Sequence, residues 1–213
     1  MLKVTDIVFD MDDTLTDTTG YIKDRIYQHY ILNNEKDKLK RLKELLKTDI
    51  STLHYDVDIR DDIWNYVIKS GEFILNVKPS PFVRSPDFHI LLDTISSKGI
   101  NLHICTHRGF LPSDTGLRFT NYWLEENYLL PFFNNVFVIS SKEYPNKLDF
   151  LDKKLPKQSY LLFDDNPLHD TNKIHPKNDK LIIYTGVNNL PGYILNTTTD
   201  NPITVLKDIL IKE

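Results

Sequence analysis

The chain has 213 residues, of which 40% are hydrophobic and 26% charged, and its formal net charge is −4. These values are typical of a folded protein with one ordinary domain, or with a core and one modest insertion. Aromatic residues alone make up 11% of the chain, which excludes global disorder. The acidic balance weighs against extended nucleic acid as a partner, because such a surface needs an excess of basic residues.

The cysteine content and the apolar runs limit where in the cell the protein is expected. Cys105 is the single cysteine, which excludes a disulfide within the chain and a zinc site built on several thiolates. No uncharged apolar run approaches the length of about eighteen residues that a membrane span needs. The first residues lack the apolar core of a signal peptide. We therefore expect a cytoplasmic protein without a membrane partner, in which Cys105 is an unreactive hydrophobic residue.

Short apolar runs recur along the chain, and their length and β-branched content favour buried strands. These runs cover residues 7–9, 102–105, 136–139, 160–163 and 181–184. Segments with helical patterns separate several of them. This alternation predicts an α/β fold with a Rossmann-like, three-layer core, in which helices wrap both faces of a mostly parallel sheet.

Helices are expected between and after these strands. Ser85 and Pro86 are typical of a helix start, Gly99 is typical of the position after a helix end, and apolar residues at helical spacing fill 88–95. Further helices are expected over 117–128, 148–155 and 203–211. Residues 186–200 are rich in Asn and Thr, and we expect a long loop there, near the sheet edge.

Residues 17–80 interrupt the alternation. Segments 22–32, 36–47 and 59–70 all have helical patterns, and the Lys-rich background of 36–47 is typical of a solvated helix face. Paired prolines at 79 and 81 stiffen the return of the chain. We expect a small helical cap over 17–80, inserted after the first strand, and a core formed by 1–16 and 81–213.

Acidic residues follow two of the expected strands. Asp10 and Asp12 come after the first strand, and Asp164 and Asp165 come after the fourth. Because ligands of open α/β sheets bind beyond the carboxyl ends of the strands, we expect the two acidic pairs to converge. Closely packed carboxylates repel one another, and a bound hard cation relieves that repulsion. Oxygen ligands favour Mg²⁺, which usually shares its shell with a substrate phosphate.

Two further segments carry candidate phosphate ligands. The second strand ends in Thr106, His107 and Arg108, and a hydroxyl with backbone N–H groups can hold phosphate oxygens there. His107 and Arg108 bind a phosphate, or Arg108 pairs with an acid; the sequence leaves both open. Lys147 precedes the fourth strand and would neutralise a nucleophile and a phosphate. Lys142 and Lys154 are its neighbouring alternatives.

These residues together carry a family resemblance. Residues 10–16, Asp-Met-Asp-Asp-Thr-Leu-Thr, resemble the first motif of the haloacid dehalogenase (HAD) superfamily of phosphohydrolases. Thr106 resembles the second motif, Lys147 the third, and residues 164–165 the fourth. The motifs span nearly the whole chain in the expected order. Asp13 is a departure, since glycine is commonest at that position in the superfamily.

The resemblance implies a mechanism for phosphate ester hydrolysis. Asp10 would attack phosphorus and form an aspartyl-phosphate. Asp12 would protonate the leaving alcohol and then deprotonate the attacking water. Thr106 and Lys147 would hold the transferring oxygens, and Thr14 is expected among the substrate-binding residues.

The resemblance also implies a metal site. Mg²⁺ would be held by a carboxylate oxygen of Asp10, by the backbone carbonyl of Asp12 and by a carboxylate oxygen of Asp164. Asp165 would orient the metal shell without binding the ion directly.

A closer resemblance is to the 5′(3′)-deoxyribonucleotidases. The shared features are the helical insertion, Trp64 followed by Phe73 and by Val-Lys-Pro at 77–79, Ile-Cys-Thr at 104–106, and Leu-Leu-Phe-Asp-Asp at 161–165. The segments 80–82 and 107–109 depart from that family. The resemblance implies a nucleoside monophosphate as the substrate, with Trp64 and Phe73 stacking on the base. Aromatic residues on helices more often fill a core, and we expect this for at least one of Trp64, Tyr66 and Phe73.

Three alternatives compete with the nucleotidase interpretation. A polynucleotide 3′-phosphatase is compatible with the Thr-His-Arg segment and with the helix around Trp123, although the acidic balance weighs against it. A phosphatase of another small metabolite has the same site requirements. A non-catalytic binding protein would lack one of the motif aspartates, and all of them are present. Whether the chain forms a homodimer is left open by the sequence.

Overall fold

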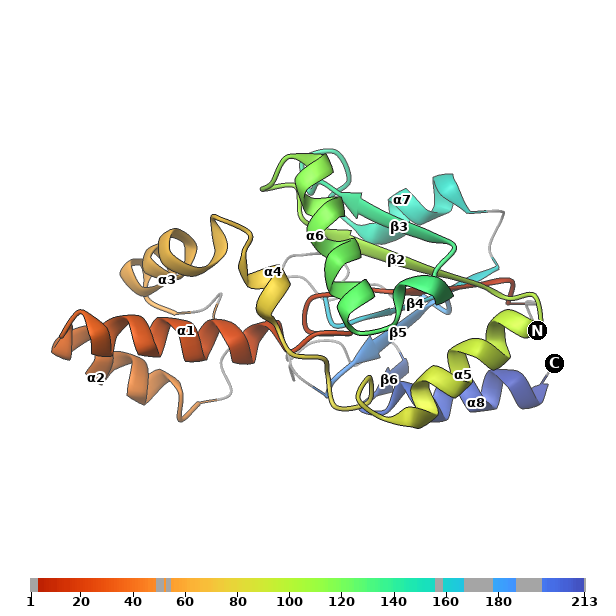
Figure 1. Cartoon of the computed structure of the whole chain (residues 1–213), viewed down its shortest axis with the longest axis horizontal. Helices are drawn as coiled ribbons and strands as arrows, with labels where there is room; N and C mark the ends of the chain where they lie inside the picture. The colour runs from red at the N-terminus through yellow and green to blue at the C-terminus, as the bar shows by residue number, and fades with distance from the viewer. Residues whose placement is uncertain are drawn as a thin grey trace.

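The computed structural model describes residues 4–48, 52, 55–155, 159–166, 178–186 and 197–212. Six strands form one sheet in the order β3-β2-β1-β4-β5-β6, and all neighbouring strands are parallel. The strands are β1 (Asp6–Phe9), β2 (Asn101–His107), β3 (Asn135–Ile139), β4 (Tyr160–Asp164), β5 (Leu181–Tyr184) and β6 (Thr197–Thr199). The α/β fold with a parallel, Rossmann-like sheet is therefore confirmed (Figure 1).

Helices of the core connect these strands and end the described chain. They are α5 (Pro86–Ser97), α6 (Ser113–Glu126), α7 (Lys147–Lys154) and α8 (Pro202–Lys212), with a short 3₁₀ turn, η3 (Leu130–Phe132). Ser85 occupies the N-cap position of α5, and Pro86 is the first helical residue, as the sequence predicts. Gly99 follows the end of α5 with φ +77°, a conformation that glycine adopts without steric cost.

The apolar core lies on both faces of the sheet because successive side chains of a strand point to opposite faces. Ile7 and Phe9 of β1 belong to the larger cluster, to which α5, α6 and α8 contribute. Val8 belongs to the smaller cluster, which also contains the buried Cys105 and apolar residues of α7. The middle strand is thus buried from both sides, and this explains why residues 7–9 form an uninterrupted apolar run.

The helical insertion projects to one side of the sheet (left in Figure 1). It consists of α1 (Thr18–Leu32), α2 (Lys36–Leu45), α3 (Val57–Ile63), the π-helix η2 (Trp64–Ile68) and α4 (Phe73–Asn76). The chain leaves and re-enters the core through adjacent segments: the Asp17 N–H donates to the Lys78 carbonyl at 2.9 Å, and the Ser80 N–H donates to the Leu15 carbonyl at 2.8 Å. These paired segments support our proposal that the insertion is a cap over 17–80.

Two predicted elements differ in detail. The helix expected over 59–70 divides into α3 and the π-helix η2, where the Lys69 N–H donates to the Trp64 carbonyl five residues earlier. Within the segment 186–200, expected as a loop, residues 197–199 form the edge strand β6, because a run of β-branched threonines favours pairing with β5. Residues 187–196 of that expected loop lie outside the described residues.

Trp123 on α6 serves the core. Its side chain is 1% exposed, and its indole N–H donates to the Val77 carbonyl at 2.8 Å. The hydrogen bond fixes α6 against the segment by which the chain returns from the cap. Among the described residues, no helix combines the length and the apolar character that crossing a membrane requires.

A buried polar cluster lies at the start of β1. The Asp6 side chain is 2% exposed, accepts from the Thr5 hydroxyl at 2.6 Å and the Asn101 amide at 3.1 Å, and lies 2.9 Å from Nε2 of His103. Burial by itself raises the pKa of Asp6. The hydrogen bonds from Thr5, His103 and Asn101 together outweigh burial, so the pKa lies below its ordinary value.

We expect Asp6→Asn to lower the free energy of unfolding at pH 7 by about 1–3 kcal/mol, because a charged acceptor in a buried network is lost. A lowered native pKa stabilises the fold above the unfolded-state pKa of about 3.9, and this stabilisation is lost as pH falls through the native value. The free energy of unfolding, measured with urea from pH 7 to pH 3, should therefore fall less steeply for the variant than for the wild type. The control is Asp93→Asn at an exposed site. Parallel acid declines for Asp6→Asn and wild type would contradict the assignment.

Candidate active site

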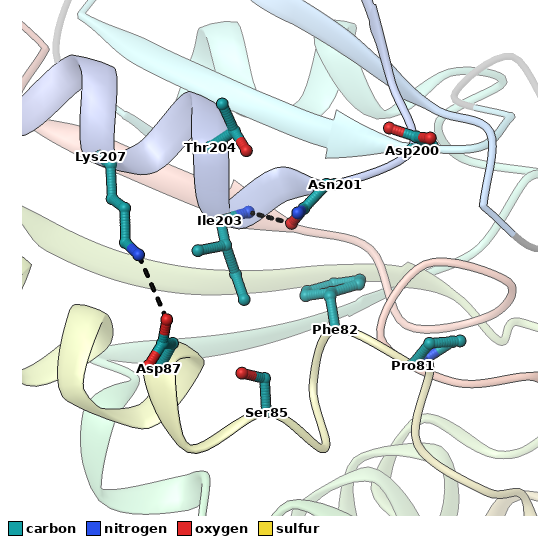
Figure 2. Close-up of a pocket in the computed structure, with 9 residues that line it drawn as sticks. All are labelled: Pro81, Phe82, Ser85, Asp87, Asp200, Asn201, Ile203, Thr204 and Lys207. Atoms are coloured by element: carbon teal, nitrogen blue, oxygen red, sulfur yellow. Dashed lines mark hydrogen bonds and ion pairs between the residues drawn. The ribbon is translucent and has the colours of Figure 1, made fainter.

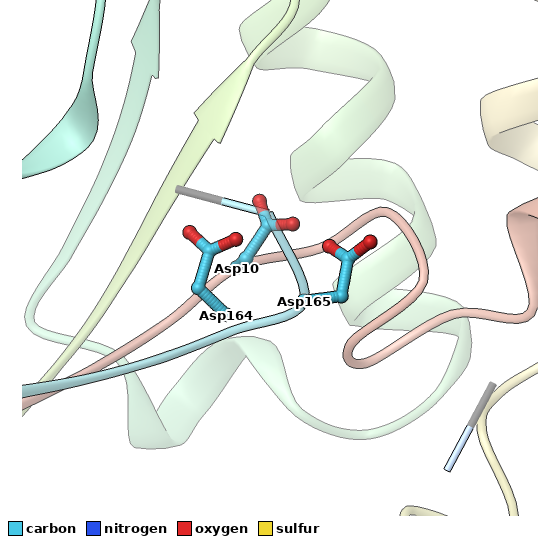
Figure 3. Close-up of side chains that lie close together, drawn as sticks. All are labelled: Asp10, Asp164 and Asp165. Atoms are coloured by element: carbon cyan, nitrogen blue, oxygen red, sulfur yellow. The ribbon is translucent and has the colours of Figure 1, made fainter. Parts of the chain in front are cut away.

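Three acidic side chains meet at the carboxyl ends of neighbouring strands β1 and β4. Asp10 follows β1 directly, Asp164 is the last residue of β4, and Asp165 comes next. Carboxylate oxygens of the three residues lie within 4.8 Å of one another, and all three side chains are buried (Figure 3). The structure therefore brings together residues that are more than 150 positions apart in the sequence. We call Asp10, Asp164 and Asp165 the carboxylate cluster.

Lys147 bridges two members of the carboxylate cluster. Its Nζ lies 2.7 Å from Oδ1 of Asp10 and 2.7 Å from Oδ2 of Asp164. Lys147 is the first residue of α7, and the Asn146 side chain caps this helix by accepting from the Asp149 N–H at 2.7 Å. The side chains of the two alternatives, Lys142 and Lys154, are exposed. The structure thus places Lys147 at the cluster and leaves the other two lysines at the surface.

The electrostatics of the carboxylate cluster favour a bound cation. Burial raises the pKa of Asp10 to about 8, and the charges of Asp164 and Asp12 add to the rise while Lys147 opposes it. Burial and the neighbouring charges of Asp13 and Asp164 also raise the pKa of Asp165 well above its ordinary value. One ammonium group does not balance three carboxylates. An oxygen-only donor set with excess negative charge fits Mg²⁺.

Asp12 faces a different set of partners from Asp10. Arg108 forms a two-pronged ion pair with it, since Nε donates to Oδ2 at 3.1 Å and Nη2 donates to Oδ1 at 3.0 Å. The Thr18 hydroxyl donates to Oδ1 at 2.9 Å, and the Thr106 hydroxyl lies 3.4 Å from Oδ2. Burial raises the pKa of Asp12, but Arg108 and then Thr18 outweigh it and hold the pKa below its ordinary value.

Arg108 does not reach an open surface. Its side chain is fully buried, and the remaining nitrogen, Nη1, donates to the Thr120 hydroxyl at 2.7 Å. The sequence left two interpretations open for Arg108, binding a phosphate and pairing with an acid, and the structure shows the pairing with an acid. The physical reason is that Asp12 and Thr120 occupy both edges of the guanidinium group.

Thr14 and His107 also have protein partners. The Thr14 hydroxyl is buried and accepts from the Asp165 N–H at 3.1 Å, so it ties the loop after β1 to the end of β4. Its expected contact with a substrate stays a prediction. Nε2 of His107 lies 2.9 Å from the Tyr144 carbonyl, and the side chain is half-buried.

Asp13 accounts for the departure from the usual first motif. Its φ is +59°, in the left-handed region where glycine is favoured and where Asp is better tolerated than most residues. The Asp13 carboxylate accepts from the Thr19 N–H at 2.6 Å and from the Thr19 hydroxyl at 2.5 Å. These hydrogen bonds satisfy a donor in the first turn of α1 and compensate the strained backbone.

The expected aromatic contacts divide between the core and the surface. Phe73 is buried, as we expected for at least one of the three aromatic residues, and its ring stacks on Phe110 with centroids 6.2 Å apart. Trp64 is 43% exposed and meets Phe110 edge to face at 5.8 Å. Phe110, itself 38% exposed, was not expected at the site, although it stands only two residues after Arg108.

Thr18, which contacts Asp12, and Thr120, which contacts Arg108, were not predicted from the sequence either. Thr18 follows Asp17, the N-cap residue of α1, and a Thr-Thr pair at a helix start is a signal for side-chain capping. Thr120 stands inside α6 and donates to the Gly116 carbonyl at 2.7 Å. Nothing in the sequence near Thr120 indicates a contact with Arg108.

A separate cavity of about 510 Å³ lies between the starts of α5 and α8 (Figure 2). None of the expected site residues lines it. Lys207, the basic side chain in its wall, lies 3.2 Å from Asp87 of the same wall. The cavity is therefore distinct from the carboxylate cluster.

No protein-family model matches the chain, and no curated protein is a significant match. Solved structures do match over nearly the full length. A "predicted phosphatase" from Clostridium acetobutylicum is 16% identical, with a TM-score of 0.60, and the match covers 98% of this chain and 99% of that one. A haloacid dehalogenase-like family hydrolase from Streptococcus pneumoniae is 16% identical, with a TM-score of 0.56 and coverages of 96% and 98%. A protein described as a HAD-hydrolase from Bacillus subtilis, bound to magnesium, is 16% identical, with a TM-score of 0.52 and coverages of 98% and 99%.

At this level of identity the comparisons show the fold. The chain has the HAD-like, Rossmann-type fold that its motif order predicted. The neighbours are described as a predicted phosphatase and as hydrolases of the HAD superfamily, and these descriptions do not single out the nucleotidases.

We expect Mg²⁺ at millimolar concentration to raise the melting temperature by several degrees, because the ion binds the native carboxylate cluster and not the unfolded chain. Asp164→Asn should abolish this shift, whereas the exposed control Asp93→Asn should keep it. Differential scanning calorimetry with Mg²⁺ and with EDTA measures the shift. An undiminished Mg²⁺ shift in Asp164→Asn would place the ion elsewhere.

We expect Lys147→Met to lower the free energy of unfolding without Mg²⁺ by roughly 3–5 kcal/mol, because it leaves buried carboxylates without their partner. Mg²⁺ should restore part of the loss. The matched controls are Lys142→Met and Lys154→Met, which should change stability by less than about 0.5 kcal/mol. Denaturant unfolding in EDTA and in Mg²⁺ separates these cases, and a Lys147→Met effect as small as that of the controls would refute the bridging role.

Proposed function

We propose that the protein is a Mg²⁺-dependent phosphomonoester hydrolase that works through an aspartyl-phosphate intermediate. The observation that carries this proposal is the position of Lys147, whose ammonium group lies 2.7 Å from both Asp10 and Asp164 at the carboxyl edge of the sheet. A negative nucleophile approaches a negative phosphate only where positive charge compensates both. The HAD-superfamily phosphatases among the structural neighbours support the same reaction class.

In the first half-reaction, a carboxylate oxygen of Asp10 attacks phosphorus, and the bond between phosphorus and the ester oxygen breaks. Asp12 must enter this step in its protonated form; it donates that proton to the departing ester oxygen and becomes a carboxylate. In the second half-reaction, Asp12 accepts a proton from water, whose oxygen attacks phosphorus. The bond to Asp10 then breaks, and inorganic phosphate leaves with the carboxylate of Asp10 regenerated.

Other groups of the chain hold the phosphoryl oxygens and the cation. Lys147 and the Thr106 hydroxyl stand beside Asp10 and Asp12 and are our proposed donors to phosphoryl oxygens. Asp10, the backbone carbonyl of Asp12 and Asp164 would hold Mg²⁺. A carboxylate oxygen of Asp165 also lies within 4.8 Å of oxygens of Asp10 and Asp164. The cation would supply charge neutralisation for the nucleophile and the phosphate.

We further propose a nucleoside monophosphate as the substrate. Phe110 stands two residues after Arg108, so their Cα atoms are at most about 7 Å apart, and Arg108 contacts Asp12. The partly exposed rings of Phe110 and Trp64 meet edge to face, and Phe110 belongs to the same short segment as Arg108. Aromatic faces of this kind stack on bases. The buried Arg108 is not available to a nucleic-acid strand, which removes one argument for a polynucleotide 3′-phosphatase.

We expect phosphate release from deoxyribonucleoside monophosphates in Mg²⁺ and none in EDTA. Asp10→Asn should lower kcat by at least about 10³-fold, because the nucleophile is lost while the fold stays intact. A panel of 5′- and 3′-nucleotides, sugar phosphates and a 3′-phosphorylated oligonucleotide identifies the preferred ester. Preference for the oligonucleotide would contradict the substrate proposal, and full activity of Asp10→Asn would contradict the mechanism. A folded wild type that releases phosphate from no ester would favour a binding role.

We expect Trp64→Ala to raise KM for nucleoside monophosphates about tenfold, in line with the loss of one base-stacking contact. KM for p-nitrophenyl phosphate, which has no base, should stay within about twofold. The control is Tyr66→Ala, because Tyr66 is a second exposed aromatic of η2 whose ring stacks on His29. Equal effects of the two variants would argue against base stacking by Trp64.

A further inference from the structure

Arg108 is the one arginine among the described residues whose side chain is fully buried. Burying a guanidinium group is unfavourable unless charged and hydrogen-bonding partners compensate it. Three contacts of the guanidinium group do so here: two to the Asp12 carboxylate and one from Nη1 to Thr120. In addition, the Arg108 backbone N–H donates to the Ile139 carbonyl at 3.1 Å. None of the steps of the proposed reaction assigns a role to Arg108.

The contacts of Arg108 join rigid elements to a catalytic loop. Its backbone is fixed to the end of β3 through Ile139, and its Nη1 is fixed to α6 through Thr120, which in turn donates to the Gly116 carbonyl. Asp12, in contrast, belongs to the loop after β1. The guanidinium group therefore transmits the position of two packed elements to a carboxylate on a loop, where the backbone of Asp12 forms an isolated bridge with Thr16.

The fork geometry fixes the orientation of the carboxylate as well as its place. Two parallel N–H···O bonds hold both oxygens of Asp12 in the plane of the guanidinium group. The other contacts of Asp12 are single bonds from neutral hydroxyls, those of Thr18 and Thr106. A lysine at position 108 would offer a point charge without this planar fork.

We propose that Arg108 is a positioning residue that orients the Asp12 carboxylate for proton transfer to the ester oxygen and from the attacking water. The assignment rests on the proposed function. It differs from a substrate-binding role, in which Arg108 would contact the phosphate itself. It also differs from a purely structural role, because it ties Arg108 to the proton-transfer steps.

A positioning role and a purely structural role of Arg108 can be distinguished by comparing substrates with different leaving groups. An alkyl ester, such as a deoxyribonucleoside 5′-monophosphate, needs a proton on its departing oxygen. The 2,4-dinitrophenolate of 2,4-dinitrophenyl phosphate departs without one. The value of kcat/KM reports the steps up to release of the leaving group, so a misplaced Asp12 should lower it for the alkyl ester only. Hydrolysis of the aspartyl-phosphate needs Asp12 for both esters.

We expect Arg108→Met to lower kcat/KM for the deoxyribonucleoside monophosphate by about 10²–10³-fold, and for 2,4-dinitrophenyl phosphate by less than about tenfold. The variant should release a burst of about one dinitrophenolate per enzyme molecule, since the aspartyl-phosphate forms quickly and hydrolyses slowly. Arg108→Lys should recover at most a small part of the loss. In an Asp12→Asn background, Arg108→Met should add no further loss, because both changes remove the same step.

Two further variants keep the test decisive if Arg108→Met does not fold. Thr120→Val removes the contact to Nη1 but keeps the ion pair of Arg108 with Asp12. It should lower kcat/KM for the alkyl ester about three- to tenfold while sparing the dinitrophenyl ester. Arg118→Met is the matched control, because Arg118 is an exposed arginine of α6. It should change neither value. Folding of each variant is checked by the Mg²⁺ shift in melting temperature.

The outcomes distinguish failure of this assignment from failure of the proposed function. Equal losses for both esters in Arg108→Met and Thr120→Val, or a gain in activity, would overturn the positioning role while the hydrolase stands. A rise in KM for both esters with unchanged kcat would show substrate binding and would also overturn it. A wild type that hydrolyses neither ester would overturn the proposed function and the assignment with it.

Discussion

The ion pair of Lys147 with Asp10 and Asp164 is the contact on which the rest of the site depends. Parallel pairing of β1 with β4 forces two carboxylates together at one edge of the sheet, and a third follows in the next residue. Buried like charges at such distances are unfavourable unless a cation neutralises them. The helix α7 begins at the residue that supplies this charge, and the cap by Asn146 fixes where the helix begins. Strand order and helix start together thus create the electrostatic environment of Asp10.

Two carboxylates only two residues apart have opposite environments. Asp10 lies among other carboxylates, and burial raises its pKa. Asp12 lies against a guanidinium group, which keeps its pKa low in spite of burial. Asp10 therefore has an ammonium group beside it, whereas a fixed fork of donors sets the orientation of the Asp12 carboxylate. Only Met11, whose side chain is buried in the apolar core, stands between them.

The sequence predicts the core well because its signals are local. Short apolar runs mark five of the six strands, and acids after two of them predict the carboxylate cluster. The partners of Arg108 and Thr14 were not predictable, since each depends on which segments close on one another in space. Arg108 meets Asp12, 96 positions away, and Thr14 meets Asp165, 151 positions away. The edge strand β6 was missed because its three residues are too few to show a strand periodicity within a segment rich in Asn and Thr.

The helical insertion and the core both donate hydrogen bonds to Asp12, the proposed acid. The Thr18 hydroxyl, in the first turn of α1, and Nη2 of Arg108, from the core, both donate to Oδ1 of Asp12. Thr19, next to Thr18, holds Asp13 in the same way. The bond from Arg108 is charge-assisted and two-pronged, whereas the bond from Thr18 is a single neutral one. The position of the carboxylate is therefore set mainly by the core, and the first turn of the cap helix is aligned to it.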